Sequence, residues 1–116
     1  MRIAISVWED KISPVLDTAS KLLIIDKDSQ KESSRFEVTL IEQNMSKRCA
    51  FIRKLEPDIL ICGAVSRQFS KMLKTSGIKI ISGISGPTKE VLEAYLQGGL
   101  LHSGLFMPGG KNNTFD

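Results

Sequence analysis

The sequence has none of the long apolar segments that cross membranes. Its longest uninterrupted apolar runs, at residues 22–25 and 59–62, are four residues each, whereas a spanning helix needs about 20. The N-terminal residues MRIAISVW form a strand pattern and lack the basic, apolar and small-residue zones of a signal peptide. We therefore expect a cytoplasmic protein with no membrane partner.

Residues that bind metals or carry out catalysis are few. The cysteines are Cys49 and Cys62, and the histidine is His102. Without a C-x-x-C spacing they form no zinc or iron-sulfur cage by themselves, and a disulfide is not expected in a reducing cytosol. No nucleophile and base stand at a recognisable spacing, which predicts a protein that is not an enzyme.

The positive charge is concentrated in the middle of the chain. Residues 44–79 carry eight basic and two acidic side chains, although the net charge of the whole chain is only +3. Such a region attracts anionic ligands or partners. The aromatic residues within it, Phe51 and Phe69, fall on apolar patterns, so no stacking platform for nucleic acid is visible.

Length and composition indicate one folded domain. The chain has 116 residues, of which 41% are hydrophobic and 25% charged, and these are ordinary values for a globular protein. We place the domain at residues 1–108 and expect a flexible, glycine-rich tail at 109–116.

Hydrophobic periodicity predicts five strands and three helices. The strands are expected at residues 2–7, 21–26, 35–41, 58–62 and 78–82. The helices should begin after Asn44, which is a suitable N-cap, at about Ser66, and at Pro87 or Thr88, each before an apolar stripe. Cys49 falls on the buried stripe of the first helix.

The third strand should be half exposed and should form a hairpin with the second. Phe36 and Val38 alternate with polar residues, which predicts that they point inward, and the polar stretch 27–34 is read as the turn. The segment between the first two strands, residues 8–20, is long for a compact domain, and such segments are usually functional.

The order of the elements predicts an α/β fold with a mixed five-stranded sheet and about three helices. The first, fourth and fifth strands should be parallel, because helices connect the later ones. Ligands of open α/β sheets lie outside the carboxyl ends of such strands. The loops beginning at Trp8, Cys62 and Ser82 should therefore meet at one edge of the sheet.

Two features of these loops indicate a binding site. Cys62 ends a strand just before a helix N-terminus, where the helix dipole favours thiolate over thiol; alternatively, it is a small buried hydrophobe. The stretches CGAVS and SGISGPT offer backbone amides to an anion, with Arg67 as the nearest cation, or else their glycines only permit tight turns.

Three stretches carry a resemblance to a known family. "MRIAISVWEDKISPVLDTASKLLIID", "ILICGAVS" and "GIKIISGISGPTKEVLEAYLQGGL" resemble the dinitrogenase iron-molybdenum cofactor biosynthesis family, which includes NifX-like proteins and the C-terminal domain of NifB. The resemblance covers roughly residues 1–108 and implies a ribonuclease-H-like three-layer fold. It also implies an accessory or carrier role in nitrogen fixation, with cofactor-assembly proteins as partners.

The resemblance implies an iron-molybdenum or iron-sulfur cluster, or its precursor, as the bound cofactor. Relatives often have a histidine after the Ser-Pro pair and a cysteine after Met-Pro-Gly, whereas Val15 and Gly110 stand here. Cys62 and His102 remain as the expected metal ligands. The expected cofactor-binding residues are Ser13, Cys62, Gly63, Ser66, Arg67 and Ser85.

Two other functions remain open from the residues alone. The same glycine-rich loops suit a regulatory module that binds a small anionic metabolite. The exposed third strand suits a protein-interaction domain that pairs its edge with a partner.

Overall fold

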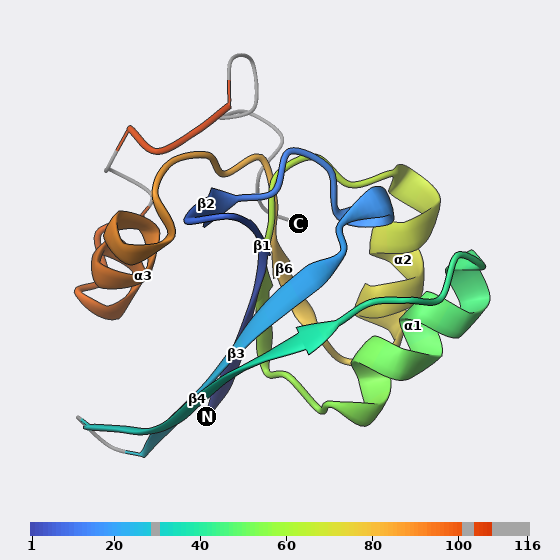
Figure 1. Ribbon diagram of the computed structural model, residues 1–116, viewed down its shortest axis with the longest axis horizontal. Helices are drawn as coiled ribbons and strands as arrows, with labels where there is room; N and C mark the ends of the chain where they lie inside the picture. The colour runs from blue at the N-terminus through green and yellow to red at the C-terminus, as the bar shows by residue number, and fades with distance from the viewer. Residues whose placement is uncertain (29–30, 101–103, 108–116) are drawn as a thin grey trace.

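The computed structural model describes residues 1–28, 31–100 and 104–107 and shows a sheet with helices on both faces (Figure 1). Its strands are β1 (Arg2–Trp8), β2 (Lys11–Ile12), β3 (Lys21–Asp28), β4 (Lys31–Thr39), β5 (Ile59–Ile61) and β6 (Lys79–Ile81). Its helices are the 3-10 turn η1 (Leu16–Thr18) and the α-helices α1 (Met45–Lys54), α2 (Arg67–Thr75) and α3 (Thr88–Leu96).

The sheet is mixed, as the sequence predicts. Its strand order is β4-β3-β1-β5-β6. β1, β5 and β6 are parallel to one another, whereas β3 is antiparallel to both of its neighbours, β1 and β4. The sixth strand, β2, was not expected. It folds back on β1 through a turn in which Glu9 has a φ of 57°. This left-handed conformation could not be predicted from the sequence, because glycine or asparagine usually adopts it.

Two apolar cores pack against the two faces of the sheet, because side chains alternate along each strand. Ala4 of β1 points toward α1 and α2, and its neighbours Ile3 and Ile5 point toward α3. All three are fully buried. Figure 1 shows α1 and α2 together on one side of the sheet and α3 on the other.

The β3–β4 hairpin is longer than the sequence indicates. The polar stretch at 27–34 was read as a turn, but most of it continues the two strands. Edge strands are held by backbone hydrogen bonds and need no apolar side chains at their exposed ends. Phe36 lies on the same face as Val38, opposite the core residue Ile24, but it is less buried than the sequence predicts, with 40% of its surface exposed at this edge.

The predicted cap at Asn44 is confirmed, and Ser66, at the predicted start of the second helix, is also a cap. The Asn44 side chain accepts a hydrogen bond from the Lys47 amide at 3.1 Å, and the Ser66 hydroxyl accepts one from the Phe69 amide at 3.2 Å. These caps satisfy amides that have no partner inside the helix. They set the start of α1 and of α2, and α2 follows directly from the loop that contains Cys62.

Arg2 holds the end of the sheet where β1 begins. Its Nε and Nη2 donate to the Asp26 carboxylate at 2.7 and 3.0 Å, and its Nη1 donates to the Leu55 carbonyl at 2.7 Å. The hydrogen bonds from Arg2 and Ser34 lower the pKa of Asp26 to about 2. This bidentate pair ties β1, β3 and the end of α1 together.

Candidate functional site

The loops after β1, β5 and β6 lie side by side at one edge of the sheet. The Ala64 amide donates to the Pro14 carbonyl at 2.8 Å, and the Leu16 amide donates to the Ala64 carbonyl at 2.8 Å. On the other side, the Gly83 amide donates to the Gly63 carbonyl at 2.9 Å. The predicted convergence of these three loops, which we call the rim, is therefore present.

Gly63 allows the first two loops to come this close. A β-carbon added at Gly63 would lie 2.5 Å from the Ser13 carbonyl oxygen and 2.6 Å from that of Pro14. Both contacts are with backbone atoms, which cannot turn aside as a side chain can. The glycine thus serves close packing of the loops, which is neither of the two roles that the sequence left open.

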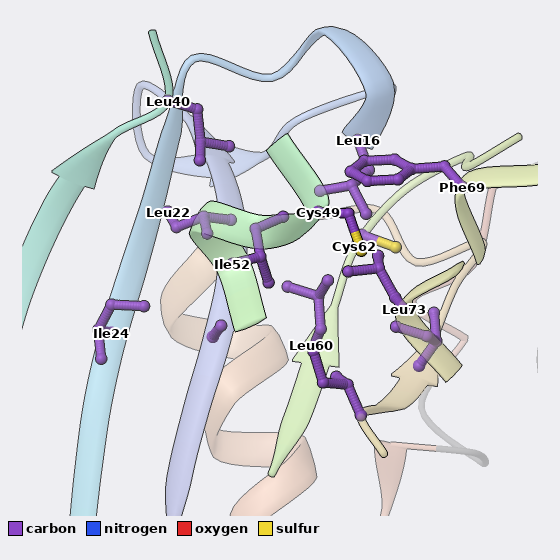
Figure 2. Packing of buried hydrophobic residues seen from close by; sticks show 13 residues of the cluster. Leu16, Leu22, Ile24, Leu40, Cys49, Ile52, Leu60, Cys62, Phe69 and Leu73 are labelled. Atoms are coloured by element: carbon purple, nitrogen blue, oxygen red, sulfur yellow. The ribbon is translucent and has the colours of Figure 1, made fainter. Parts of the chain in front are cut away.

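Cys62 is not exposed at the rim. Its side chain is fully buried, and Figure 2 shows it among Leu16, Phe69, Leu73 and Cys49 in the core on the α1 and α2 side of the sheet. Burial, followed by the nearby Asp17 carboxylate, raises the pKa of its thiol to about 12. The expectation of a reactive thiol at this position is wrong, because the thiol is buried and its thiolate would be desolvated.

The second cysteine behaves as the sequence predicts. Cys49 is 4% exposed and belongs to the same core as Cys62. Both cysteines are free thiols. Among the described residues, no group of three or more His, Cys, Asp or Glu side chains could hold a metal ion.

The N-terminus of α2 is already occupied by an anion of the protein itself. Asp17, in η1, accepts the Ser66 amide at 2.8 Å through Oδ1 and the Ser66 hydroxyl at 2.6 Å through Oδ2. The sequence does not predict this role for Asp17, because its partner is 49 positions away. The carboxylate takes the place that a bound anion was expected to take.

The amides of the loop after β6 are also used within the protein. The Ile84 amide donates to the Cys62 carbonyl at 3.0 Å, and the Ser85 amide donates to the Leu105 carbonyl at 3.1 Å. The Thr88 amide, at the start of α3, donates to the Asp10 carbonyl at 2.9 Å. Most amides of the two predicted anion sites are therefore used within the protein, so the geometry gives little support to a metabolite site built from them.

Positive charge remains exposed beside this closed arrangement. Arg67 is exposed in the first turn of α2, and Lys71 is exposed one turn later. Residues four apart lie on the same side of a helix. The two cations therefore form a surface patch next to Ser66, which we call the Arg67–Lys71 patch.

The predicted site residues are thus only partly brought together at an accessible surface. Ser66 and Arg67 are exposed, Ser85 is half-buried, and Ser13, Cys62 and Gly63 are buried. His102, the second predicted metal ligand, lies outside the described residues. The accessible part of the predicted site is therefore the start of α2.

Arg48 holds the rim in place through side-chain hydrogen bonds to backbone carbonyls, a role that the sequence does not predict. It is only 4% exposed, and its Nη2 donates to the carbonyls of Leu16 and Ala19 at 3.0 and 2.7 Å, while its Nη1 donates to the Glu42 carbonyl at 2.9 Å. Burial lowers the pKa of its guanidinium. The buried cation holds η1, and with it Asp17, in position.

The chain belongs to the family described as dinitrogenase iron-molybdenum cofactor, which it matches over residues 1–98. No protein with a curated description matches it in sequence. No helix among the described residues is both long and apolar enough to cross a membrane.

Several solved structures share the fold. The protein PH0822 has a TM-score of 0.77 at 20% identity, with 84% of this chain and 90% of that one covered. The apo form of the orange protein from Desulfovibrio gigas has a TM-score of 0.70 at 18% identity, with 84% and 88% covered. A protein from Methanocaldococcus jannaschii has a TM-score of 0.68 at 21% identity, with 85% and 90% covered. These likenesses confirm the predicted α/β fold class.

Proposed function

We propose that the protein is a non-catalytic accessory protein that carries an iron-molybdenum or iron-sulfur type cofactor, or a precursor of it, as cargo. Membership of the iron-molybdenum cofactor family supports the kind of cargo. The observation that carries the proposed mode of binding is the exposed Arg67–Lys71 patch beside the rim.

Metal-sulfur units that need such a carrier are anionic, and the patch supplies what an anion requires. Guanidinium and ammonium groups form charge-assisted hydrogen bonds with anionic ligands. Ser66 directly precedes Arg67 in the chain. The Asp17 carboxylate, which binds Ser66, repels an anionic ligand and so weakens its binding to the patch. Binding of this kind is weak and reversible, which suits cargo that is passed on.

Cys62, which the sequence predicts to be a metal ligand, does not make the first contact with the cargo in this proposal. Its sulfur could reach a metal only if the segment around Leu16 moved away from the core. We therefore assign the first contact with the cargo to the Arg67–Lys71 patch. Ser13 and Gly63 shape the loops next to it.

A direct test uses tetrathiomolybdate, a small molybdenum-sulfur anion, under anaerobic conditions. Binding is measured by equilibrium dialysis with molybdenum analysis. The double variant Arg67→Gln/Lys71→Gln should weaken binding by about tenfold or more, because it removes two charge-assisted contacts.

The matched control removes the same charges from the neighbouring helix. Arg53 and Lys47 are exposed on α1, so Arg53→Gln/Lys47→Gln changes the net charge equally but leaves the patch intact. Equal weakening by both double variants would mean that only the overall charge matters, and the proposed site would be wrong.

A further inference from the structure

A second surface, distinct from the Arg67–Lys71 patch, lies on the opposite face of the sheet. An open groove of about 700 Å³ runs between α3 and the β3–β4 hairpin. Figure 1 shows α3 on this face, and its residues Leu92, Glu93 and Leu96 line one side of the groove. Its apolar lining comes from Val7, Leu23, Leu92 and Leu96.

Negative charge dominates the walls of the groove. They carry five carboxylates and two cations. One cation, Arg35, is already paired with Glu32, at 2.7 Å from Nη2 to Oε1 and 2.9 Å from Nε to Oε2. For Glu9, Asp10 and Glu93 no ion pair is found within the part of the chain that the structure describes. The groove thus combines an apolar floor with uncompensated carboxylates.

The strand that borders the groove has a free edge. β4 is the last strand in the order of the sheet, so its outer backbone groups pair with no other described strand. Its side chains from residue 31 to residue 37 are exposed. An extended peptide can add to such an edge through main-chain hydrogen bonds while its side chains enter a neighbouring groove.

We infer that this groove binds a basic, partly apolar segment of a partner protein. Alternating side chains of such a segment would place apolar groups on Leu23 and Leu96 and cations beside the carboxylates of Glu9, Asp10 and Glu93. The inference does not depend on the cargo proposed above, because no residue of the Arg67–Lys71 patch lines the groove.

A second copy of the chain fits the groove less well than a separate partner. α1 and α2, on the other face of the sheet, carry five exposed cations, Lys47, Arg53, Lys54, Arg67 and Lys71. Pairing that face with the groove would be head-to-tail and would not close into a symmetric dimer. A separate basic segment meets no such obstacle.

The test uses the full chain and a fluorescein-labelled heptapeptide in which lysine and leucine alternate, with a glutamate-leucine peptide as the reverse-charge probe. Anisotropy gives the affinity, and amide shifts in ¹⁵N spectra give the location. We expect the lysine peptide to bind, with shifts concentrated on β4, α3 and the turn at residues 9–10. Higher salt should weaken the binding.

Two triple variants separate the groove from overall charge. Glu9→Asn/Asp10→Asn/Glu93→Gln should weaken binding of the lysine peptide by about tenfold or more; asparagine at position 9 tolerates the left-handed backbone there. Asp28→Asn/Glu42→Gln/Glu90→Gln removes as many carboxylates outside the groove and should leave the affinity within about twofold. Leu96→Ser should also weaken binding, because it removes apolar lining.

Several outcomes would overturn the inference. The lysine peptide could fail to bind, or the glutamate peptide could bind equally well. The amide shifts could fall on α1 or α2, or the two triple variants could lose the same amount of affinity. A doubling of mass in solution that the groove variant alone abolishes would assign the surface to a second copy instead of a partner protein.

Discussion

The carboxylate of Asp17 accepts both the amide and the hydroxyl of Ser66, at 2.8 and 2.6 Å. This contact joins the loop after β1 to the first turn of α2. It also places a negative charge where the helix would otherwise attract an external anion. Asp17 therefore affects both the stability of the rim and the charge that an anionic ligand meets.

Replacing Asp17 should separate these two effects. Asp17→Ala removes both acceptors, and we expect the free energy of unfolding to fall by about 1 kcal/mol, as for the loss of a helix cap. Asp17→Asn keeps an acceptor for the Ser66 amide but removes the charge, so it should bind tetrathiomolybdate severalfold more tightly than the native chain. Urea denaturation and equilibrium dialysis measure the two effects. Unchanged or weaker binding by Asp17→Asn would contradict the role of the charge.

Adding a methyl group at Gly63 should force the rim apart. Its β-carbon would lie within 2.6 Å of two backbone carbonyl oxygens, and overpacking of this kind costs about 1–3 kcal/mol. We also expect Cys62 to react faster with iodoacetamide in Gly63→Ala, because the loop that covers it is displaced. Gly99→Ala is the control, since its nearest contact would be an ordinary 3.9 Å. Equal stability of the two variants would argue against close packing at Gly63.

Loss of Arg48 should destabilise the protein far more than loss of an exposed arginine. Arg48→Ala removes the side-chain donor to the Ala19 carbonyl and leaves the Leu16 carbonyl with the Ala19 amide alone, which we expect to cost about 2–4 kcal/mol. Arg48→Lys should recover only part of this, because an ammonium lacks the fork of the guanidinium. Arg53→Ala should change stability by no more than about 0.5 kcal/mol. Similar urea midpoints for the two alanine variants would contradict the anchoring role.

The acid stability of the protein should depend on Asp26. Its pKa is about 2, below its ordinary value, because Arg2 and Ser34 donate hydrogen bonds to the carboxylate. A lowered pKa stabilises the fold above the unfolded-state pKa of about 4, and this stabilisation is lost as the pH falls toward 2. Asp26→Asn should therefore lower the Tm at pH 7 by a few degrees and reduce its dependence on pH between 4 and 2.

The exposed carboxylate Asp28 provides the comparison for this measurement. Asp28→Asn should leave the Tm at pH 7, and the change of Tm between pH 4 and 2, close to those of the native chain. If Asp26→Asn and Asp28→Asn gave the same acid profile, the Arg2–Asp26 pair would not be the cause.

Much of the fold could be predicted because it rests on local patterns. The starts of α1 and α2 follow from caps that act across three residues, Asn44 to Lys47 and Ser66 to Phe69. The parallel strands follow from helices placed between apolar runs. The turn at Glu9 escaped prediction, since its left-handed backbone is imposed by the pairing of β1 with β2 and not by its own side chain.

The site was harder to predict because its decisive contacts join distant parts of the chain. Asp17 and Ser66 are 49 positions apart, and Arg48 reaches back 32 positions to Leu16. A cysteine at a strand end suits either a ligand or a core position, and only the packing of Leu16 and Phe69 around Cys62 decides which it is. Sequence could place the rim but could not show that it is closed.

Binding of tetrathiomolybdate to Cys62→Ala tests the central claim, that the cargo is held at the surface by charge and not by a thiolate. Circular dichroism and a urea curve first establish that the variant is folded, since loss of a buried sulfur costs some stability. We predict that its affinity for the anion stays within about twofold of the native chain, in contrast to the loss of about tenfold expected for Arg67→Gln/Lys71→Gln. Loss of molybdenum uptake in folded Cys62→Ala, with uptake preserved in the Arg67→Gln/Lys71→Gln variant, would contradict this account and make the buried thiol a ligand.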